Sequence, residues 1–232
     1  MTTPLWSGRF DTAPDATAFE FGASFAFDRR LFEDDVTGSI AWARALAKAG
    51  VLAPEEARDI EATLHEILEL GRATPAFIAG DDEDVHSFVE RLVVERLGDA
   101  GRRLHTGRSR NEQVSLDLRL YLRRRIPLLQ QAIAGLVSAL AGQASLAGEA
   151  LMPAFTHFRP AQPVLVAHFF LAHVAALRRD FDRLADARLE ADALPLWSGA
   201  IAGTAYAVDV DALASDLGFS HIVANSIDAS SD

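Results

Sequence analysis

The sequence predicts an all-α protein: a small helical N-terminal domain over residues 1–105, followed by part of a long-helix bundle over residues 106–232. Apolar residues recur at steps of three and four, which indicates amphipathic helices. Glycine and proline stand where these helices should end or begin. Residues 112–147 form one helical run that would be about 50 Å long, a length that suits a bundle rather than a small globular domain.

The first thirty residues show no sustained helical period, so we expect an extended arm there. A first helix follows, beginning near Leu31 and ending before Gly50, a residue suited to the position after a helix. A second begins at Pro54, which fits the first helical position, and ends at Gly71. A loop follows over residues 72–83.

The acidic residues 81–84 open a third helix, which ends at Gly98. The run 112–147 comes next, and Pro127 inside it predicts a kink or a break near Ile126, because a mid-helix proline removes a hydrogen bond. Residues 148–163 are expected to be a connection without regular structure.

A further helix is expected from Pro163 towards Ala193, followed by a glycine-containing loop over residues 194–204. A short helix over 210–217 has Asp209 as its cap. Residues 225–232 are typical of the entry to another helix.

Composition narrows the function classes. Half of the 232 residues are hydrophobic and 24% are charged, so a sizeable core is expected. The net charge of -11 argues against nucleic acid or an anionic membrane surface as a partner. No cysteine is present, which excludes disulfides and cysteine-bound zinc. No secretory leader is visible, and no apolar run approaches the roughly 20 residues of a membrane span, so we expect a cytoplasmic protein.

The stretch from Leu104 to Val114, LHTGRSRNEQV, is the strongest candidate for a binding site. Its arginines match carboxylates bidentately, and its Ser, Thr and Asn side chains supply neutral donors. A helix beginning after it adds a positive dipole end. The alternative is an ordinary N-cap with a solvated charge cluster.

This stretch resembles the TGRSRN(D/E)QV segment of the argininosuccinate lyase family, within the fumarase/aspartase superfamily; Glu112 stands where most members have Asp. THFRPAQP, beginning at Thr156, resembles the family segment TH(L/F)QxAQP, with Arg159 in place of the commoner Gln. Further segments match in family order: residues 5–10, 23–29, 82–86, 194–204 and 225–232. In the fourth of these, Trp197 stands where Gly is usual.

The resemblance implies reversible elimination of argininosuccinate to arginine and fumarate, without a metal or other cofactor. It implies His157 as the catalytic acid-base residue. The substrate-binding residues it implies are Ser24, Arg108, Ser109, Arg110, Asn111 and Thr156. It also implies a homotetramer, with sites assembled from several subunits.

A later family loop reading GSSxMPxKxN has no counterpart here. We therefore expect the chain to be the N-terminal half of such an enzyme and to lack turnover alone. Two alternatives stay open: another fumarate-releasing enzyme, such as an adenylosuccinate lyase, and a non-catalytic helical scaffold resembling the lens crystallins of this family.

Overall fold

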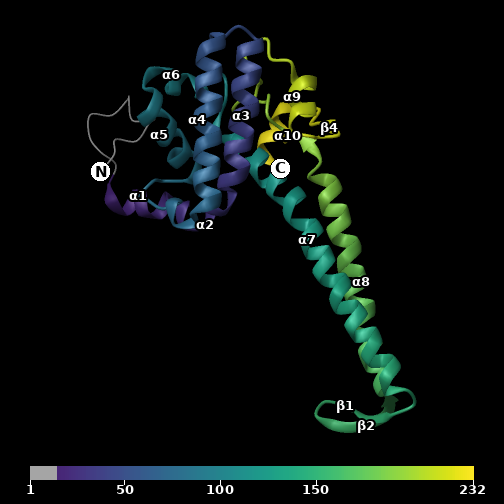
Figure 1. Ribbon diagram of the computed structural model, residues 1–232. Helices are drawn as coiled ribbons and strands as arrows, with labels where there is room; N and C mark the ends of the chain where they lie inside the picture. Colours follow the sequence, from purple (N-terminus) through teal and green to yellow (C-terminus); the bar gives the residue numbers. More distant parts are fainter. Residues whose placement is uncertain (1–14) are drawn as a thin grey trace. The chain divides into compact units, whose positions relative to one another are not determined.

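The computed structural model describes residues 15–232, so the resemblance at residues 5–10 lies outside the described part. The chain divides into two compact units (Figure 1). Unit 1 comprises Met1–Tyr121 with Ala193–Asp232, and unit 2 comprises Leu122–Asp192. The fold is helical as predicted, whereas the domain boundary at residue 105 stays a prediction.

The expected extended arm is wrong for the residues that the structure describes. α1 spans Ala16–Gly22 and α2 spans Phe25–Asp28, followed by a 3-10 turn over Arg29–Leu31. The Asp15 side chain caps α1 by accepting hydrogen bonds from the amides of Thr17 and Ala18. Both helices are too short to display a hydrophobic period, which explains why the sequence did not indicate them.

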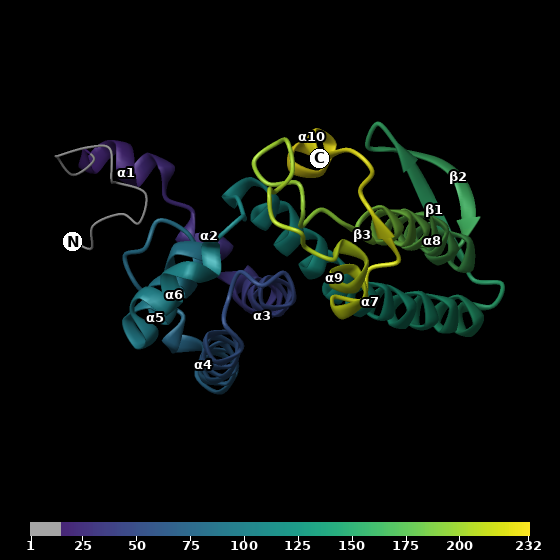
Figure 2. The ribbon, with the colours of Figure 1, turned by 90° about the horizontal axis from the view of Figure 1, so that it is seen from above.

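The three N-terminal helices predicted from periodicity are confirmed. α3 spans Phe32–Lys48, α4 spans Pro54–Ala73 and α5 spans Val85–Leu97. α3 and α4 lie side by side, as Figures 1 and 2 both show. Their apolar faces and that of α5 form the core of unit 1, whose largest fully buried side chains include Trp42, Phe88, Leu46, Ile60 and Leu64. Short helical turns cover Pro75–Phe77, Asp99–Arg102 (α6) and Arg103–His105.

α7 spans Arg110–Ala147 without interruption, so of the expected kink or break near Ile126 the break is wrong, and the kink stays a prediction. A proline removes only one backbone donor, and the helix continues on both sides of it. Unit 1 contains the first part of α7, up to Tyr121, and unit 2 contains the remainder.

The C-terminal part of unit 1 is irregular with short elements. α9 spans Val210–Asp216 and is capped by Asp209, and α10 spans Ser226–Ser231 and is capped by Asn225; both were predicted. β3, Ala193–Leu194, pairs in parallel with β4, His221–Ile222. Strands of two residues carry no sequence pattern, so this pairing was not foreseen.

Unit 2 is a helical hairpin whose tip is a β-hairpin. The expected irregular connection is wrong: β1, Leu151–Thr156, pairs antiparallel with β2, Arg159–Leu165. α8, Val166–Glu190, then lies alongside α7 (Figure 1). Proline is unfavourable inside a sheet because it lacks a ladder donor, but the prolines of this region lie in a two-stranded sheet with only edges, where a missing donor is tolerated.

The helices of unit 2 leave most of their apolar side chains uncovered. None of residues 166–190, all of which the structure describes, is buried. An open groove of about 490 Å³ lies between α7 and α8 and is lined by Leu136, Leu140, Phe169 and Leu177.

α7 is also long and apolar enough to cross a membrane, by length and composition alone, contrary to the expectation that no such run is present. One such helix is only weakly indicative, because helices of bundles can be equally long and apolar.

Candidate functional site

Ser24 is attached to the beginning of α5. Its backbone N–H donates to the Glu83 carbonyl at 2.7 Å, and its hydroxyl donates to Asp28 Oδ2 at 2.5 Å. The second oxygen of Asp28 accepts a hydrogen bond from the Val85 amide at 3.1 Å. The segments containing Ser24 and the α5 N-terminus are therefore fixed to each other by both backbone and side-chain contacts.

Arg110 lies against the same end of α5. Its Nε is 3.5 Å from Asp84 Oδ2, and its Nη2 donates to the Ser87 hydroxyl at 3.4 Å. Nη1 donates to Gln113 Oε1 at 3.2 Å, one turn along α7. The side chain remains 28% exposed, so these weak contacts leave the guanidinium accessible to an anion. The structure thus brings Ser24 and Arg110 to one place, the start of α5.

Ser109 and Asn111 form the N-terminus of α7. Ser109 Oγ accepts a hydrogen bond from the Asn111 amide at 3.3 Å, as an N-cap does. Asn111 is exposed, and its Nδ2 donates to the Ala200 carbonyl at 3.3 Å. Gly107 precedes them with a φ of 72°, and a Cβ there would lie 2.6 Å from the Tyr206 ring. The turn needs glycine at that point for both conformation and space.

Arg108 points into the fold. It is 8% exposed, and its Nη1 donates to Ser39 Oγ at 3.0 Å. Burial lowers its pKa, while Asp35 and Asp117 oppose that shift. The Arg108 guanidinium is buried and hydrogen-bonded within unit 1, so its predicted contact with the substrate stays a prediction.

A buried polar network lies beneath the arginine-rich turn. His86 Nδ1 is 2.8 Å from Asp35 Oδ1 and 3.2 Å from Asp117 Oδ2, and Gln113 Nε2 donates to Asp35 Oδ1 at 2.5 Å. Burial alone would lower the pKa of His86, but the two carboxylates outweigh it and raise that pKa to about 10. Burial raises the pKa of Asp117 well above its usual range, with Asp35 adding to the shift.

Asp35, His86 and Asp117 are residue types that can bind a metal ion, and their potential ligand atoms lie within 4.8 Å of one another. The imidazolium, however, already supplies a positive charge between the carboxylates. The Gln113 amide donates to Asp35, and against the effect of burial the charges of His86 and Arg108 help to hold the pKa of Asp35 below its usual value. The network is therefore an internally charge-paired cluster at the turn, although Asp35 Oδ2 and Asp117 Oδ1 have no hydrogen-bond partner among the described residues. The sequence did not indicate this network, because Asp35 and Asp117 are single acidic residues within helices and form no recognisable motif.

His105 and Glu90 form a second titratable pair under the turn. His105 Nδ1 is 3.8 Å from Glu90 Oε2, and Arg110 Nη2 is 3.7 Å from the same oxygen. Burial lowers the pKa of His105 to about 4, with Arg108 and Arg110 contributing. His105 is thus neutral at physiological pH, the opposite of His86.

Thr156 and His157 form a second group, at the turn between β1 and β2 in unit 2. Both are exposed. His157 and Phe158 have φ values of 50° and 60°, in the left-handed region that non-glycine residues rarely occupy. Two central residues with positive φ are what the commonest two-residue hairpin turns require. The turn therefore presents the His157 imidazole to solvent at some conformational cost.

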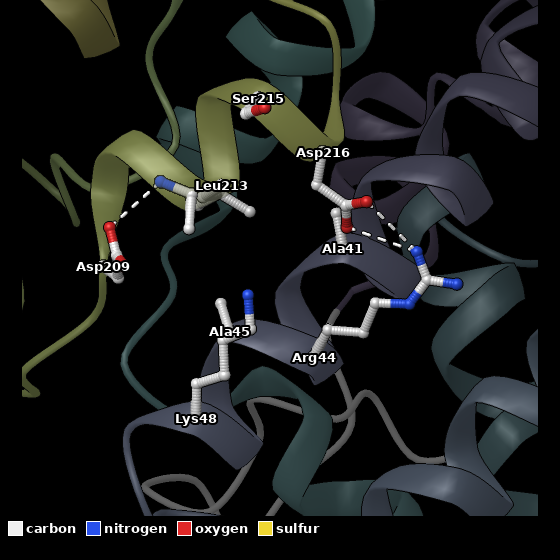
Figure 3. A pocket seen from close by; sticks show the side chains of 9 residues that line it. Ala41, Arg44, Ala45, Lys48, Asp209, Leu213, Ser215 and Asp216 are labelled. Carbon is white, nitrogen blue, oxygen red and sulfur yellow. Dashed lines mark hydrogen bonds and ion pairs between the residues drawn. The ribbon is translucent and has the colours of Figure 1, made fainter.

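A small pocket between α3 and α9 lies elsewhere in unit 1 (Figure 3). It has a volume of about 300 Å³, and Arg44 lines it while pairing with Asp216 at 3.2 Å and with Glu61. None of the predicted site residues lines it. We interpret it as an ion-paired surface groove.

The chain is similar to curated lyases. The chain is 46% identical over 228 residues to an argininosuccinate lyase from Desulforudis audaxviator (strain MP104C). The match covers 98% of this chain and 50% of that relative, so the chain spans about half the length of the relative.

Solved structures agree on the fold. An EDDS lyase in complex with formate has a TM-score of 0.73 at 24% identity, covering 94% of this chain and 44% of that one. A fumarate lyase:delta crystallin from Brucella melitensis bound to cobalt has a TM-score of 0.72 at 18% identity, covering 97% and 52%. A family described as lyase matches residues 8–232, and the chain therefore belongs to this lyase family of the fumarase/aspartase superfamily.

Proposed function

We propose that this chain carries part of the active site of an argininosuccinate lyase, which cleaves argininosuccinate to arginine and fumarate. The observation that carries the proposal is the 46% identity to an argininosuccinate lyase along 98% of the chain. The local geometry supports it, because Ser24, Ser109, Arg110 and Asn111 gather at the N-termini of α5 and α7, where donors for a dicarboxylate are in place.

The chemistry needs such donors. A proton leaves the carbon beside a carboxylate, the C–N bond breaks to form the fumarate double bond, and the departing guanidinium nitrogen takes up a proton. The intermediate charge on the carboxylate oxygens is stabilised by donors that are already oriented. We assign Asn111, Ser109 and Arg110 to that role, with Ser24 and Thr156 orienting the substrate. Arg108 supports the turn from inside.

His157 is assigned to proton transfer, since an imidazole changes charge near neutral pH. Its place at an exposed hairpin turn in unit 2 suits a residue offered to a site completed by other segments. The family resemblance implies further catalytic residues in a later loop, which has no counterpart in this sequence.

A substrate panel tests the proposal. Calorimetric titration should show argininosuccinate binding at least about tenfold tighter than adenylosuccinate, and Asn111→Ala should weaken it by about tenfold, the loss of one strong hydrogen bond. Gln143→Ala, an exposed amide change on the same helix, is the matched control. Preferential binding of adenylosuccinate would favour the other lyase, and no binding by the unmodified chain would favour a non-catalytic scaffold.

Turnover is a separate test. The chain alone should release no fumarate from argininosuccinate, because the later family loop is not in the sequence. Fumarate absorbance measures this directly, and turnover by the chain alone would refute the need for that loop.

We propose a homotetramer as the assembled form, in the cytoplasm. The uncovered apolar side chains of α7 and α8 support this, because apolar patches of this kind mark protein interfaces. Gln130, Gln131 and Gln143 interrupt the apolar part of α7, which favours packing against protein helices rather than lipid.

A further inference from the structure

Glu112 is a fully buried carboxylate that joins two separate segments of unit 1. Its Oε1 accepts a hydrogen bond from the Ser109 amide at 3.0 Å. Its Oε2 accepts from the amides of Trp197 at 2.8 Å and Gly199 at 2.9 Å, and the Ser198 hydroxyl lies at 3.5 Å. A carboxylate without exposure persists only when its oxygens are satisfied. These donors come from the α7 N-terminus and from residues 197–203, here called the glycine loop.

The glycine loop is shaped to present its amides to this carboxylate. The Gly203 amide donates to the Ser198 carbonyl at 2.7 Å, which closes the loop on itself. Gly199 has a φ of 58°, and a Cβ there would lie only 2.5 Å from the Gly203 carbonyl oxygen. Because neither the conformation nor the space admits a side chain, Gly199 is what allows the loop to close over Glu112.

The glycine loop also contacts Asn111, one of the predicted substrate-binding residues. The Ala200 carbonyl, next to Gly199, accepts a hydrogen bond from Asn111 Nδ2 at 3.3 Å. That bond fixes which end of the Asn111 amide faces the loop and which end faces solvent. Glu112 therefore acts on Asn111 through the glycine loop as well as through the helix cap.

We propose that Glu112 is a positioning residue for dicarboxylate binding: its carboxylate fixes the glycine loop, and the loop orients the Asn111 amide. The inference rests on the proposed function only where it names the ligand. That Glu112 fixes the glycine loop is inferred from its hydrogen bonds to the Trp197 and Gly199 amides.

Amide hydrogen exchange of the glycine loop tests the structural part. Glu112→Gln keeps the shape of the side chain but turns one acceptor oxygen into a donor that faces amide donors. The Trp197 and Gly199 amides should then exchange about tenfold faster or more. Glu66→Gln, an exposed change on α4, should leave them unaltered. Unchanged exchange in a folded Glu112→Gln variant would overturn the proposal.

A second variant covers the case in which Glu112→Gln does not fold. Gly199→Ala leaves Glu112 and its bond to Ser109 intact but opens the loop, because its Cβ would clash with the Gly203 carbonyl. It should release the same amides. Leu213→Ala removes a buried side chain from α9 and lowers stability without touching the loop, so it should not change their exchange relative to the rest of unit 1.

Affinity for argininosuccinate tests the functional part. Glu112→Gln and Gly199→Ala should each weaken binding by about tenfold, and Leu213→Ala should not. Wild-type affinity in either loop variant with fast-exchanging amides would overturn the positioning role. Failure of the unmodified chain to bind would overturn the proposed function, and loop exchange would still decide whether Glu112 fixes the loop.

Discussion

α3 in unit 1 and α8 in unit 2 are both long helices with apolar residues at helical spacing, yet their surroundings differ. Most of the 17 residues of α3 are buried, including Trp42, whereas none of the 25 residues of α8 is. The spacing of apolar residues predicts that a helix forms and which face is apolar, but burial depends on a partner. In unit 1 the apolar faces of α3, α4 and α5 bury one another, whereas in unit 2 α8 stays uncovered.

Matched phenylalanine changes should separate the two units most strongly. Phe88 is 2% exposed and its ring stacks on Phe25 at 5.1 Å, so Phe88→Ala should cost about 3–5 kcal/mol of unfolding free energy. Phe169 is 44% exposed, and Phe169→Ala should cost less than about 1 kcal/mol. Urea unfolding measures both. Equal losses would show that unit 2 is as well packed as unit 1.

Disrupting the buried network of Asp35, His86 and Asp117 should lower the free energy of unfolding nearly as much. His86→Gln removes the cation that lies 2.8 Å from Asp35 Oδ1 and 3.2 Å from Asp117 Oδ2. Losing one partner of a buried ion pair costs about 3 kcal/mol or more. Asp35→Asn combined with His86→Gln should recover part of that loss, and no recovery in the double variant would argue against the charge pairing.

Alkaline pH tests the same network without a substitution. The folded state raises the pKa of His86 from 6.5 to about 10, so between these values it retains a proton that the unfolded chain has lost. The stabilisation is complete below pH 6.5 and is lost as the pH rises towards 10. Urea unfolding across that range should show stability falling in the unmodified chain and a flatter profile in His86→Gln. Parallel profiles would refute the raised pKa.

His105 should show a smaller effect of opposite sign. Its pKa is lowered to about 4, so its neutral form stabilises the fold above pH 6.5, and this contribution is lost as the pH falls towards 4. Its side chain is 35% exposed, which screens the interaction. NMR titration of the ring protons should show a midpoint well below 6.5. A midpoint near 6.5 would contradict the burial described here.

Charges on the groove of unit 2 should leave stability almost unaltered. Leu136→Lys and Phe169→Lys alter side chains that are 50% and 44% exposed, so the free energy of unfolding should change by less than about 0.5 kcal/mol. Association should decrease, as measured by sedimentation velocity, because a lysine in the groove costs desolvation when helices pack there. Unchanged association would place the interface elsewhere.

The sequence predicted the parts of the fold that repeat and missed those that depend on single residues. Three-to-four spacing and flanking glycine or proline predicted α3, α4 and α5. The β1–β2 hairpin was missed because its turn residues, His157 and Phe158, are not the Asn and Gly usual at positive φ.

The candidate site was predictable only in part. The arginine-rich turn, with its four donors in sequence, was visible in the chain. The capping pattern Ser-x-x-Glu over Ser109–Glu112 indicates one bond of Glu112, but its contacts with Trp197 and Gly199 come from a segment more than eighty residues away. The burial of Asp35 and Asp117 likewise depends on tertiary packing, for which one sequence gives no pattern.

The most direct test of the central claim is backbone NMR of the arginine-rich turn during titration with argininosuccinate. We expect saturable shifts at the amides of Ser109, Arg110, Asn111 and Ser24, and in Asn111→Ala these shifts should be abolished or need a much higher ligand concentration. If the resonances of these amides in the wild-type chain stay unchanged during the titration, whether or not other resonances shift, that result would contradict a dicarboxylate site at the N-terminus of α7.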